Sequence, residues 1–321
     1  MKKNILITGG SGFIGSNLAN YLANEQFKVF VVDDLSVGSK KNLSKNKNLK
    51  FFKKNINQIK LIDIKDKIDC CIHLAAKAQI LITTKNENQY FEDNVVGLQK
   101  TLNFCKNKNI KKFIFASSAS VYGDTRNKKV KENTNLSPLH FYAYSKYIGE
   151  KIIKKYCHLN KINFYILRFF NIYGPKSNAV VAKFLAQYLQ NKTITIYGNG
   201  KQSRDFVHVD DVIDIIKKLI TKNIKSNIFN VGSSRSTKIN QLKSYISSSH
   251  KSINLDKRFD DIEKSISNIS KANKILKWYP KKNFKHGILD MIKEDQARLI
   301  KLKLESVKTQ KKIIKFFNKR K

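Results

Sequence analysis

Three glycines spaced three residues apart constrain the fold of this chain more than any other feature. They are Gly9, Gly12 and Gly15 in the stretch NILITGGSGFIGSNLANYL, which begins at Asn4. The apolar run before them is typical of a strand buried on both faces, and the residues from Phe13 onward repeat with the period of an amphipathic helix. A strand, a tight glycine turn and a helix N-terminus together predict a cradle for a pyrophosphate group.

The end of the next apolar run indicates which dinucleotide this cradle would hold. The run from Val29 to Val32 lies at the distance expected for a βαβ unit and ends in Asp33 and Asp34. A carboxylate in this place accepts hydrogen bonds from the adenosine ribose hydroxyls and repels a 2′-phosphate. The sequence therefore favours NAD over NADP.

Strand-like and helix-like segments alternate through the first half of the chain. Helical periodicity is clearest over Gln89–Asn107 and Tyr142–Leu159. Further buried-strand runs occur at Lys50–Lys53, Asp69–Leu74, Lys112–Ser117, Asn163–Phe169 and Ile228–Val231. This alternation predicts an α/β fold with a Rossmann-like, doubly wound parallel sheet, in which ligands bind beyond the carboxyl ends of the strands.

The alternation loosens after Pro175, which predicts a smaller C-terminal substrate-binding lobe. We expect an NAD-binding domain over residues 1–171, with 200–232 partly returning to it, a substrate-binding lobe over 172–290, and a basic helical tail over 291–321. The lysine-rich tail carries spaced apolar residues and could lie on an anionic membrane. We favour a solvated helix or an oligomer contact for it.

Composition indicates which kinds of partner the protein could bind and in which compartment it is expected. The net charge of +39 is compatible with a nucleic-acid partner, but lysine supplies 56 of the 63 basic residues and is spread along the chain. Lys, Asn and Ile are the residues of AT-rich codons, so we favour biased genome composition over nucleic-acid binding. The positive field should still attract an anionic substrate. The four cysteines lack metal-ligand spacing, and no apolar run reaches the roughly 20 residues of a membrane span, so we expect a cytoplasmic protein.

One helical segment carries the residues from which acid–base chemistry is expected. Tyr142 and Lys146 are four residues apart in FYAYSKYIGEK and share one helix face. A lysine ammonium beside a phenol favours the phenolate, which lowers the pKa of the tyrosine and makes it a usable general base. Tyr144 has an isoleucine, not a lysine, four residues later. Ser117 and Ser118 follow a predicted strand, where a hydroxyl could bond a substrate oxygen or cap a turn.

Together these motifs resemble the extended short-chain dehydrogenase/reductases, and among them the nucleotide-sugar epimerases of the UDP-glucose 4-epimerase type. The resemblance covers about residues 3–290. Its elements occur in the family's order: TGGSGFIG, VDDLS, HLAA, NVVG, SSASVYGD, YAYSK, LRFFNIYGP, GKQSRDFVHVDD and NVGSS. Each piece is weak evidence by itself, whereas the combination is highly specific.

The resemblance implies NAD as the cofactor and assigns roles to matching positions. The NAD-binding residues would be Gly9, Gly12, Phe13, Ile14, Gly15, Asp33, Asn55, Ile56, Leu74, Ala75, Ala76, Asn94, Tyr142 and Lys146. Asn55 stands where the family usually has an aspartate that bonds the adenine amine, and an amide oxygen accepts the same bond. Ser118 and Tyr142 would face the sugar's 4-hydroxyl. The substrate's diphosphate would be bound by Asn171, Arg204 and Arg258, although Arg204 could instead pair with Asp205 at the surface.

The reaction that the resemblance implies is 4-epimerisation of a UDP-sugar, which would feed surface polysaccharide synthesis. Tyr142 would take the 4-hydroxyl proton while C4 gives hydride to NAD, and the resulting 4-keto sugar would turn over and be reduced on its other face. The family also suggests a homodimer through the two helical segments named above. Ser265 matches a position where a small residue leaves room for an N-acetyl group, which hints at UDP-N-acetylglucosamine.

Other outcomes stay open. Related 4,6-dehydratases carry an Asp-Glu pair where this chain has Ala119 and Ser120, and related UDP-glucuronate decarboxylases carry Glu at the second position. Both branches are therefore disfavoured but remain alternatives, together with a UDP-glucuronate epimerase. A nucleotide- or RNA-binding protein without activity is the alternative from a different class. The short loop over Lys176–Ala179 leaves the sugar undetermined.

Overall fold

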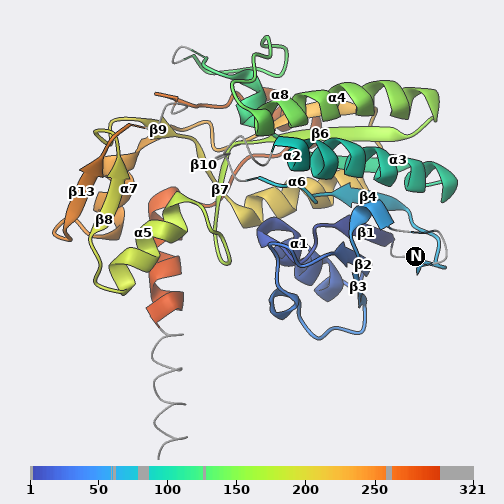
Figure 1. The fold of residues 1–321 in the computed structure, drawn as a ribbon, viewed down its shortest axis with the longest axis horizontal. Coiled ribbons are helices and arrows are strands. Elements are labelled where there is room, and N and C mark those ends of the chain that lie inside the picture. Colours follow the sequence, from blue (N-terminus) through green and yellow to red (C-terminus); the bar gives the residue numbers. More distant parts are fainter. Residues whose placement is uncertain are drawn as a thin grey trace, which may run out of the picture.

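The structure is a computed structural model that describes residues 3–58, 60, 63–78, 87–125, 128–257 and 262–296. Its centre is a sheet of seven parallel strands in the order β11-β6-β5-β4-β1-β2-β3 (Figure 1). The strands are β1 (Asn4–Thr8), β2 (Lys28–Asp33), β3 (Leu49–Lys53), β4 (Cys70–His73), β5 (Lys112–Ser118), β6 (Asn163–Phe169) and β11 (Asn227–Val231). The order reverses direction beside β1, so the carboxyl ends of β1 and β4 flank a crevice.

Helices cover both faces of this sheet. Alternate residues of β1 point to opposite faces, so Ile5 and Ile7 pack with α1 and α6 while Leu6 packs with α3 and α4. The helices of this part are α1 (Phe13–Asn24), α2 (Glu87–Phe91), α3 (Gly97–Asn107), α4 (Phe141–Leu159), α6 (Val209–Thr221) and α8 (Ser270–Leu276). The doubly wound Rossmann-like fold predicted from the sequence is confirmed.

A smaller lobe packs around a second apolar cluster. Its core includes Tyr173, Phe184, Ile194 and Leu242, and a helical segment over 284–296 contributes Ile288. The elements of the lobe are β7 (Asn171–Tyr173), α5 (Val180–Leu189), β8 (Ile194–Tyr197), β9 (Ser203–Arg204), β10 (Phe206–His208), β12 (Thr237–Lys238), α7 (Ile239–Ile246) and β13 (Ser252–Leu255). The exact domain boundaries stay a prediction, and the tail from residue 297 onward lies outside the described residues.

The predicted strands agree with the observed ones to within about one residue at each end, whereas one helix contains a turn that the periodicity did not predict. The segment expected as a helix over 89–107 consists of α2, a π-helical turn η5 (Glu92–Val96) and α3. Turns of this kind are rare and occur frequently at functional sites. Here the turn carries Asn94, one of the predicted cofactor residues.

A buried ion pair connects α4 to the strands beneath it. Glu150 and Arg168 are both about 1 % exposed, with Arg168 Nη2 2.7 Å and Nε 2.9 Å from the carboxylate of Glu150. Ser117 Oγ donates to the same carboxylate at 2.6 Å. Arg168 Nη1 also donates to the Tyr122 hydroxyl and to the carbonyl of Glu132. The pair therefore fixes α4 against β5 and β6.

Glu150→Ala should lower the free energy of unfolding by about 3–5 kcal/mol, because the guanidinium of Arg168 would stay buried without its counter-ion. Denaturant unfolding measures this change. Lys217→Ala is the matched control, since it breaks the exposed pair with Glu25 (2.9 Å) and should cost less than about 1 kcal/mol. Equal effects of the two substitutions would contradict the structural role of the buried pair.

Candidate active site

In the glycine turn after β1, packing of the protein itself requires glycine at Gly9 and Gly15 but not at Gly12. Gly9 has φ +68°, and a Cβ there would lie 2.6 Å from the backbone nitrogen of Ala75. A Cβ on Gly15 would lie 2.2 Å from the Gly9 carbonyl oxygen. Gly12 has an ordinary φ of −74°, and its Cβ would meet only that same oxygen, at 3.4 Å. Among the described residues, the space beside Gly12 is thus free of protein, which fits a pyrophosphate at the N-terminus of α1.

Asp33 lies directly beside this turn. Its buried carboxylate accepts hydrogen bonds from the backbone N–H groups of Ser11 and Leu35, both at 2.8 Å. Each carboxylate oxygen retains capacity for a ribose hydroxyl. The hydroxyl of Ser11 is buried without a hydrogen-bond partner among the described residues. An unsatisfied polar atom at this point fits a bound polar group, so the residues present are consistent with a dinucleotide.

Two predicted adenine-side residues already have protein contacts. Asn55 donates to the carboxylate of Asp34 at 3.0 Å, and its amide oxygen accepts from the N–H of Asn57 at 2.9 Å. That oxygen has a second lone pair for an adenine amine. Ile56 is buried, and a Cβ on Gly97 would lie 2.5 Å from its side chain, so Ile56 packs against α3. Contacts of both residues with the cofactor stay predictions.

The segment after β4 is held by residues from three elements. Leu74 N–H donates to the Thr8 carbonyl at 3.1 Å, and Ala75 N–H lies 3.4 Å from Thr8 Oγ1. The amide of Asn94 accepts from Lys77 N–H at 2.8 Å and donates to Ser145 Oγ on α4 at 2.9 Å. Asn94 therefore ties this loop to α4, and Leu74, Ala75 and Ala76 lie on the same loop.

His73 is a residue of this region that the sequence reasoning missed. Its Nδ1 lies 2.9 Å from Thr8 Oγ1, and its ring stacks with Phe113 and Phe115 at 6.0 Å. Burial, with the nearby charge of Lys146, lowers the pKa of His73 to about 3. The imidazole is therefore neutral and joins β1 to β4 behind the site. Its place in the quoted HLAA motif was the available signal.

Helix α4 places Tyr142 and Lys146 on the face that lies against β5. The helix begins at Phe141, where Nδ1 of His140 accepts from the N–H of Ala143. The ammonium nitrogen of Lys146 lies 4.8 Å from the centre of the Phe115 ring and 5.9 Å from that of Tyr142. Burial lowers the pKa of Lys146 to about 7.

The expectation of a lowered pKa for Tyr142 is wrong for the chain by itself. Burial of the hydroxyl raises the pKa of Tyr142 above its usual value, and a hydrogen bond with Ser118 offsets part of this rise. The physical reason is that desolvation opposes the charged phenolate more strongly than the neighbouring groups favour it.

Ser118 ends β5, opposite Phe169 in the register of β5 and β6. Two residues after Phe169, Asn171 begins β7, so Asn171 lies at the same edge of the sheet as Ser118. Ser118 also caps the short helix η6 (Ala119–Tyr122) by accepting from the N–H of Ser120. Ser118 therefore caps a turn and also lies near Tyr142. The three predicted catalytic residues, Ser118, Tyr142 and Lys146, thus lie close together.

Arg204 lies half-buried in the smaller lobe. Its Nη1 donates to the carbonyls of Ser203 at 2.9 Å and Ile262 at 2.6 Å. The carboxylate of Asp205 is buried and accepts hydrogen bonds from Ser233 and Ser267, so it fixes a turn of the lobe rather than lying at the surface. Arg258, the other predicted phosphate ligand, lies outside the described residues.

A cavity of about 670 Å³ opens beside Ser203. The charged side chains along its wall are Lys201, Lys238, Lys257, Lys264 and Glu263. Four ammonium groups against one carboxylate make this space suitable for an anionic ligand.

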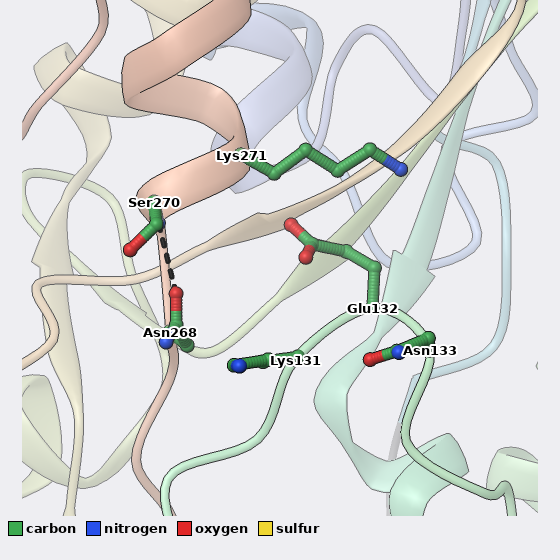
Figure 2. A pocket seen from close by; sticks show the side chains of 6 residues that line it. All are labelled: Lys131, Glu132, Asn133, Asn268, Ser270 and Lys271. Carbon is green, nitrogen blue, oxygen red and sulfur yellow. Dashed lines mark hydrogen bonds between the residues drawn. The ribbon is translucent and has the colours of Figure 1, made fainter.

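A second cavity, of about 440 Å³, lies next to the buried ion pair, because the carbonyl of its lining residue Glu132 accepts from Arg168. Figure 2 shows the side chains that line it. Its wall is formed by Lys131, Glu132, Asn133, Asn268, Ser270 and Lys271. The carboxylate of Glu132 accepts from the N–H of Asn230 at 2.9 Å, while its carbonyl accepts from Arg168. None of these six residues is a predicted site residue, so this cavity borders the hydrogen-bond network of the buried ion pair and not the predicted catalytic residues.

Comparison with known proteins agrees with this geometry. The model of the NAD-dependent epimerase/dehydratase family matches residues 5–232. The chain belongs to this family. The match covers the glycine turn, the predicted catalytic residues Ser118, Tyr142 and Lys146, and Arg204. It confirms the predicted resemblance, an enzyme of the epimerase type, and NAD as its cofactor.

Individual family members resemble the chain over most of its length. A putative UDP-glucose 4-epimerase of Methanocaldococcus jannaschii is 35 % identical over 297 residues, covering 88 % of this chain and 95 % of that protein. The UDP-N-acetylglucosamine 4-epimerase of Methanobrevibacter ruminantium, solved with UDP-N-acetylmuramic acid, is 32 % identical with a TM-score of 0.87, covering 93 % and 100 %. The UDP-glucuronic acid 4-epimerase of Bacillus cereus, solved with UDP-glucuronic acid and NAD, is 29 % identical with a TM-score of 0.83, covering 91 % and 99 %.

No helix within the described ranges is both long and apolar enough to cross a membrane.

Gly12→Ala should separate cofactor binding from folding in this family member. The new methyl group meets no atom of the described part of the chain closer than 3.4 Å, so stability should be unchanged or rise by up to about 1 kcal/mol. The methyl group would occupy the pyrophosphate space, and NAD affinity should fall about 10- to 100-fold. Calorimetric titration with NAD and thermal melting measure the two effects. Gly15→Ala is the contrast, because its clash at 2.2 Å should lower stability as well.

Lys146→Met should abolish activity but stabilise the fold. The pKa of Lys146 is about 7 in the folded state and near 10.5 when unfolded, so between these values the unfolded chain binds more protons and stability rises with pH. Removing the group should remove this rise and increase the unfolding free energy at pH 7 by at least about 1 kcal/mol. Denaturant unfolding of both proteins at pH 7, 8.5 and 10 measures the difference, and parallel curves would contradict the assignment.

Proposed function

We propose that the protein is an NAD-dependent 4-epimerase of a UDP-sugar, acting through a 4-keto intermediate. The observation that carries this proposal is the cluster of Ser118, Tyr142 and Lys146 beside the open glycine turn. A protein that only binds a nucleotide has no need of a half-buried tyrosine and a buried lysine held together at that place.

The chain's own residues supply binding and proton transfer. Gly12 and the N-terminus of α1 would hold the pyrophosphate of NAD, and Asp33 the adenosine ribose. When bound, NAD supplies reversible hydride acceptance. Tyr142 would take the proton of the sugar's 4-hydroxyl during oxidation and return it during reduction, so acid–base demand is balanced over a turnover.

Lys146 supports this role of Tyr142 from the same face of α4. With a pKa of about 7, it changes charge near neutral pH and can bond the ribose of the nicotinamide nucleotide. Positioning of the cofactor and tuning of the base are the protein's contributions, while the hydride chemistry belongs to the cofactor.

The substrate's diphosphate fits the smaller lobe, where Asn171, Arg204 and Arg258 are the proposed ligands. The lysine-lined cavity adjoins Arg204 through Ser203 and favours an anionic nucleotide. Ser265 lies next to Ser203 at the edge of this cavity, since its backbone N–H donates to the Ser203 carbonyl at 3.2 Å. A small side chain at this position favours UDP-N-acetylglucosamine, and UDP-glucose is the next candidate.

We further propose a cytoplasmic homodimer that supplies surface polysaccharide synthesis. The solvent-facing side of α4 carries Tyr144 and Leu159, which are 52 % and 65 % exposed. Exposed apolar side chains on one helix are consistent with a helix–helix contact between two copies.

The test is proton NMR of the protein with each UDP-sugar and no added NAD. The sugars are UDP-N-acetylglucosamine, UDP-glucose and UDP-glucuronate. Anomeric signals of the galacto epimer would establish 4-epimerisation with a retained cofactor. Loss of the C6 carboxylate or of water would instead establish decarboxylation or dehydration. No conversion by protein that carries NAD would overturn the proposal, and RNA affinity with a steep salt dependence would then favour the binding alternative.

Tyr142→Phe should lower kcat about 10²- to 10⁴-fold with little change in KM, because the general base is removed while the binding groups remain. Tyr144→Phe is the matched control, since this exposed tyrosine on the same helix lacks a lysine four residues later. Steady-state kinetics on the sugar that is converted measures both. Comparable losses in the two variants would contradict the role of Tyr142.

A further inference from the structure

A tight turn with an unusual residue in it connects β7 to α5. The N–H of Ser177 donates to the carbonyl of Gly174 at 3.2 Å, which closes a four-residue turn with Pro175 and Lys176 at its centre. Lys176 has φ +69°. Proline followed by a residue of positive φ is the pattern of a type II turn, in which glycine is preferred at the second central position. A lysine there is strained relative to glycine, which points to a use for its side chain.

The side chain of Lys176 reaches the NAD-binding part of the fold. Its ammonium donates to the carbonyl of Asn42 at 2.9 Å, 134 residues earlier in the chain. Asn42 is the last residue of the short helix η1 (Lys40–Asn42), where carbonyl groups need partners from outside the helix. The carbonyl of Pro175 accepts from Asn17 Nδ2 on α1 at 3.0 Å. Both central residues of the turn are therefore bonded to segments that follow β1 and β2.

The two residues that receive these contacts also hold the glycine turn after β1. Asn42 Nδ2 donates to the carbonyl of Ser11 at 3.0 Å, directly before Gly12. Asn17 Nδ2 donates in addition to the carbonyl of Phe13 at 2.9 Å, directly after Gly12. One asparagine on each side thus links the turn after β7 to the place predicted for the pyrophosphate of NAD.

The beginning of β7 lies at the proposed substrate site. Asn171 is the first residue of β7, and its N–H donates to the carbonyl of Asp205, the neighbour of Arg204, at 3.0 Å. The strand ends at Tyr173, and the turn follows at once. A diphosphate bound by Asn171 and Arg204 would therefore order β7 and the turn together.

We propose that Lys176 is a positioning residue that retains NAD and couples its release to the substrate site. By holding Asn42, Lys176 keeps the backbone around Gly12 in the geometry that binds the pyrophosphate, and a preorganised site binds more tightly. The coupling to substrate rests on the proposed function. The retention of NAD rests only on the predicted place of its pyrophosphate.

Glycine at position 176 separates this role from a merely structural one. Lys176→Gly relieves the positive φ, which stabilises the turn, and removes one solvent-exposed hydrogen bond, which destabilises it. These two effects on folding oppose each other. The effect on NAD has no such compensation, because glycine cannot reach Asn42.

The experiment measures release of NAD from wild type, Lys176→Gly and Lys176→Arg. Each protein is loaded with radiolabelled NAD and diluted into excess unlabelled NAD, and the melting temperature of the NAD-free protein is recorded in parallel. Lys176→Gly should release NAD about 3- to 10-fold faster, with a melting temperature within about 2 °C of wild type. Lys176→Arg keeps a cationic donor and should release NAD within about twofold of the wild-type rate.

Two further measurements complete the design. Lys183→Ala is the matched control, since it removes the same charge from an exposed position on α5 and should leave the release rate unchanged. Saturating UDP should slow NAD release from wild type about 5-fold and should have a smaller effect on Lys176→Gly. Should the glycine variant fail to fold, Lys176→Asn replaces it, because asparagine tolerates positive φ and is too short to reach Asn42.

The outcomes separate this inference from the proposed function. Release at the wild-type rate from folded Lys176→Gly, or equal acceleration in Lys183→Ala, overturns the role of Lys176. Faster release together with a melting temperature lowered by more than about 5 °C assigns the effect to folding and also overturns it. Release rates as expected, in protein that converts no UDP-sugar, support the role of Lys176 and overturn the epimerase proposal alone. Faster release that UDP does not affect in wild type supports retention and overturns the coupling.

Discussion

The ion pair between Glu150 and Arg168 determines the position of α4, the helix that carries the proposed catalytic residues Tyr142 and Lys146. Tyr142, Lys146 and Glu150 are spaced four residues apart, so they share one face of α4. The same carboxylate accepts from Ser117, the neighbour of Ser118. A charge buried this deeply tolerates only an arrangement in which its partner is present. One interaction therefore sets both the rotation of α4 and its separation from the end of β5.

Burial makes the ionisable side chains of the site harder to charge, but it also strengthens the hydrogen bonds that these side chains make. It moves the pKa of Lys146 toward neutrality, keeps His73 uncharged and opposes the phenolate of Tyr142. The same low-dielectric surroundings strengthen every hydrogen bond that reaches the Tyr142 oxygen.

The sequence predicts the fold closely because its signals are local. Buried runs such as Val29–Val32 specify strands, and Gly9 and Gly15 are positions where backbone packing admits no side chain. Tyr142 and Lys146 are recognisable because helix periodicity fixes their relation. Arg168 and Glu150 come from different elements, and only the register of β5, β6 and α4 brings them together. The π turn at Asn94 and the raised pKa of Tyr142 also depend on tertiary surroundings, which no spacing rule contains.

Strand β11 makes the main sheet depend on residues that come late in the chain. It lies at the edge of the main sheet beside β6, although α5, β8 and β9 of the smaller lobe intervene along the chain. Phe229 and Val231 complete the apolar layer over Tyr165 and Leu167. The NAD-binding part of the fold therefore cannot finish folding during synthesis until the first part of the smaller lobe, from β7 to β10, has left the ribosome. The two lobes are not separable pieces, and a chain ending near residue 171 would expose core that β11 and α6 normally cover.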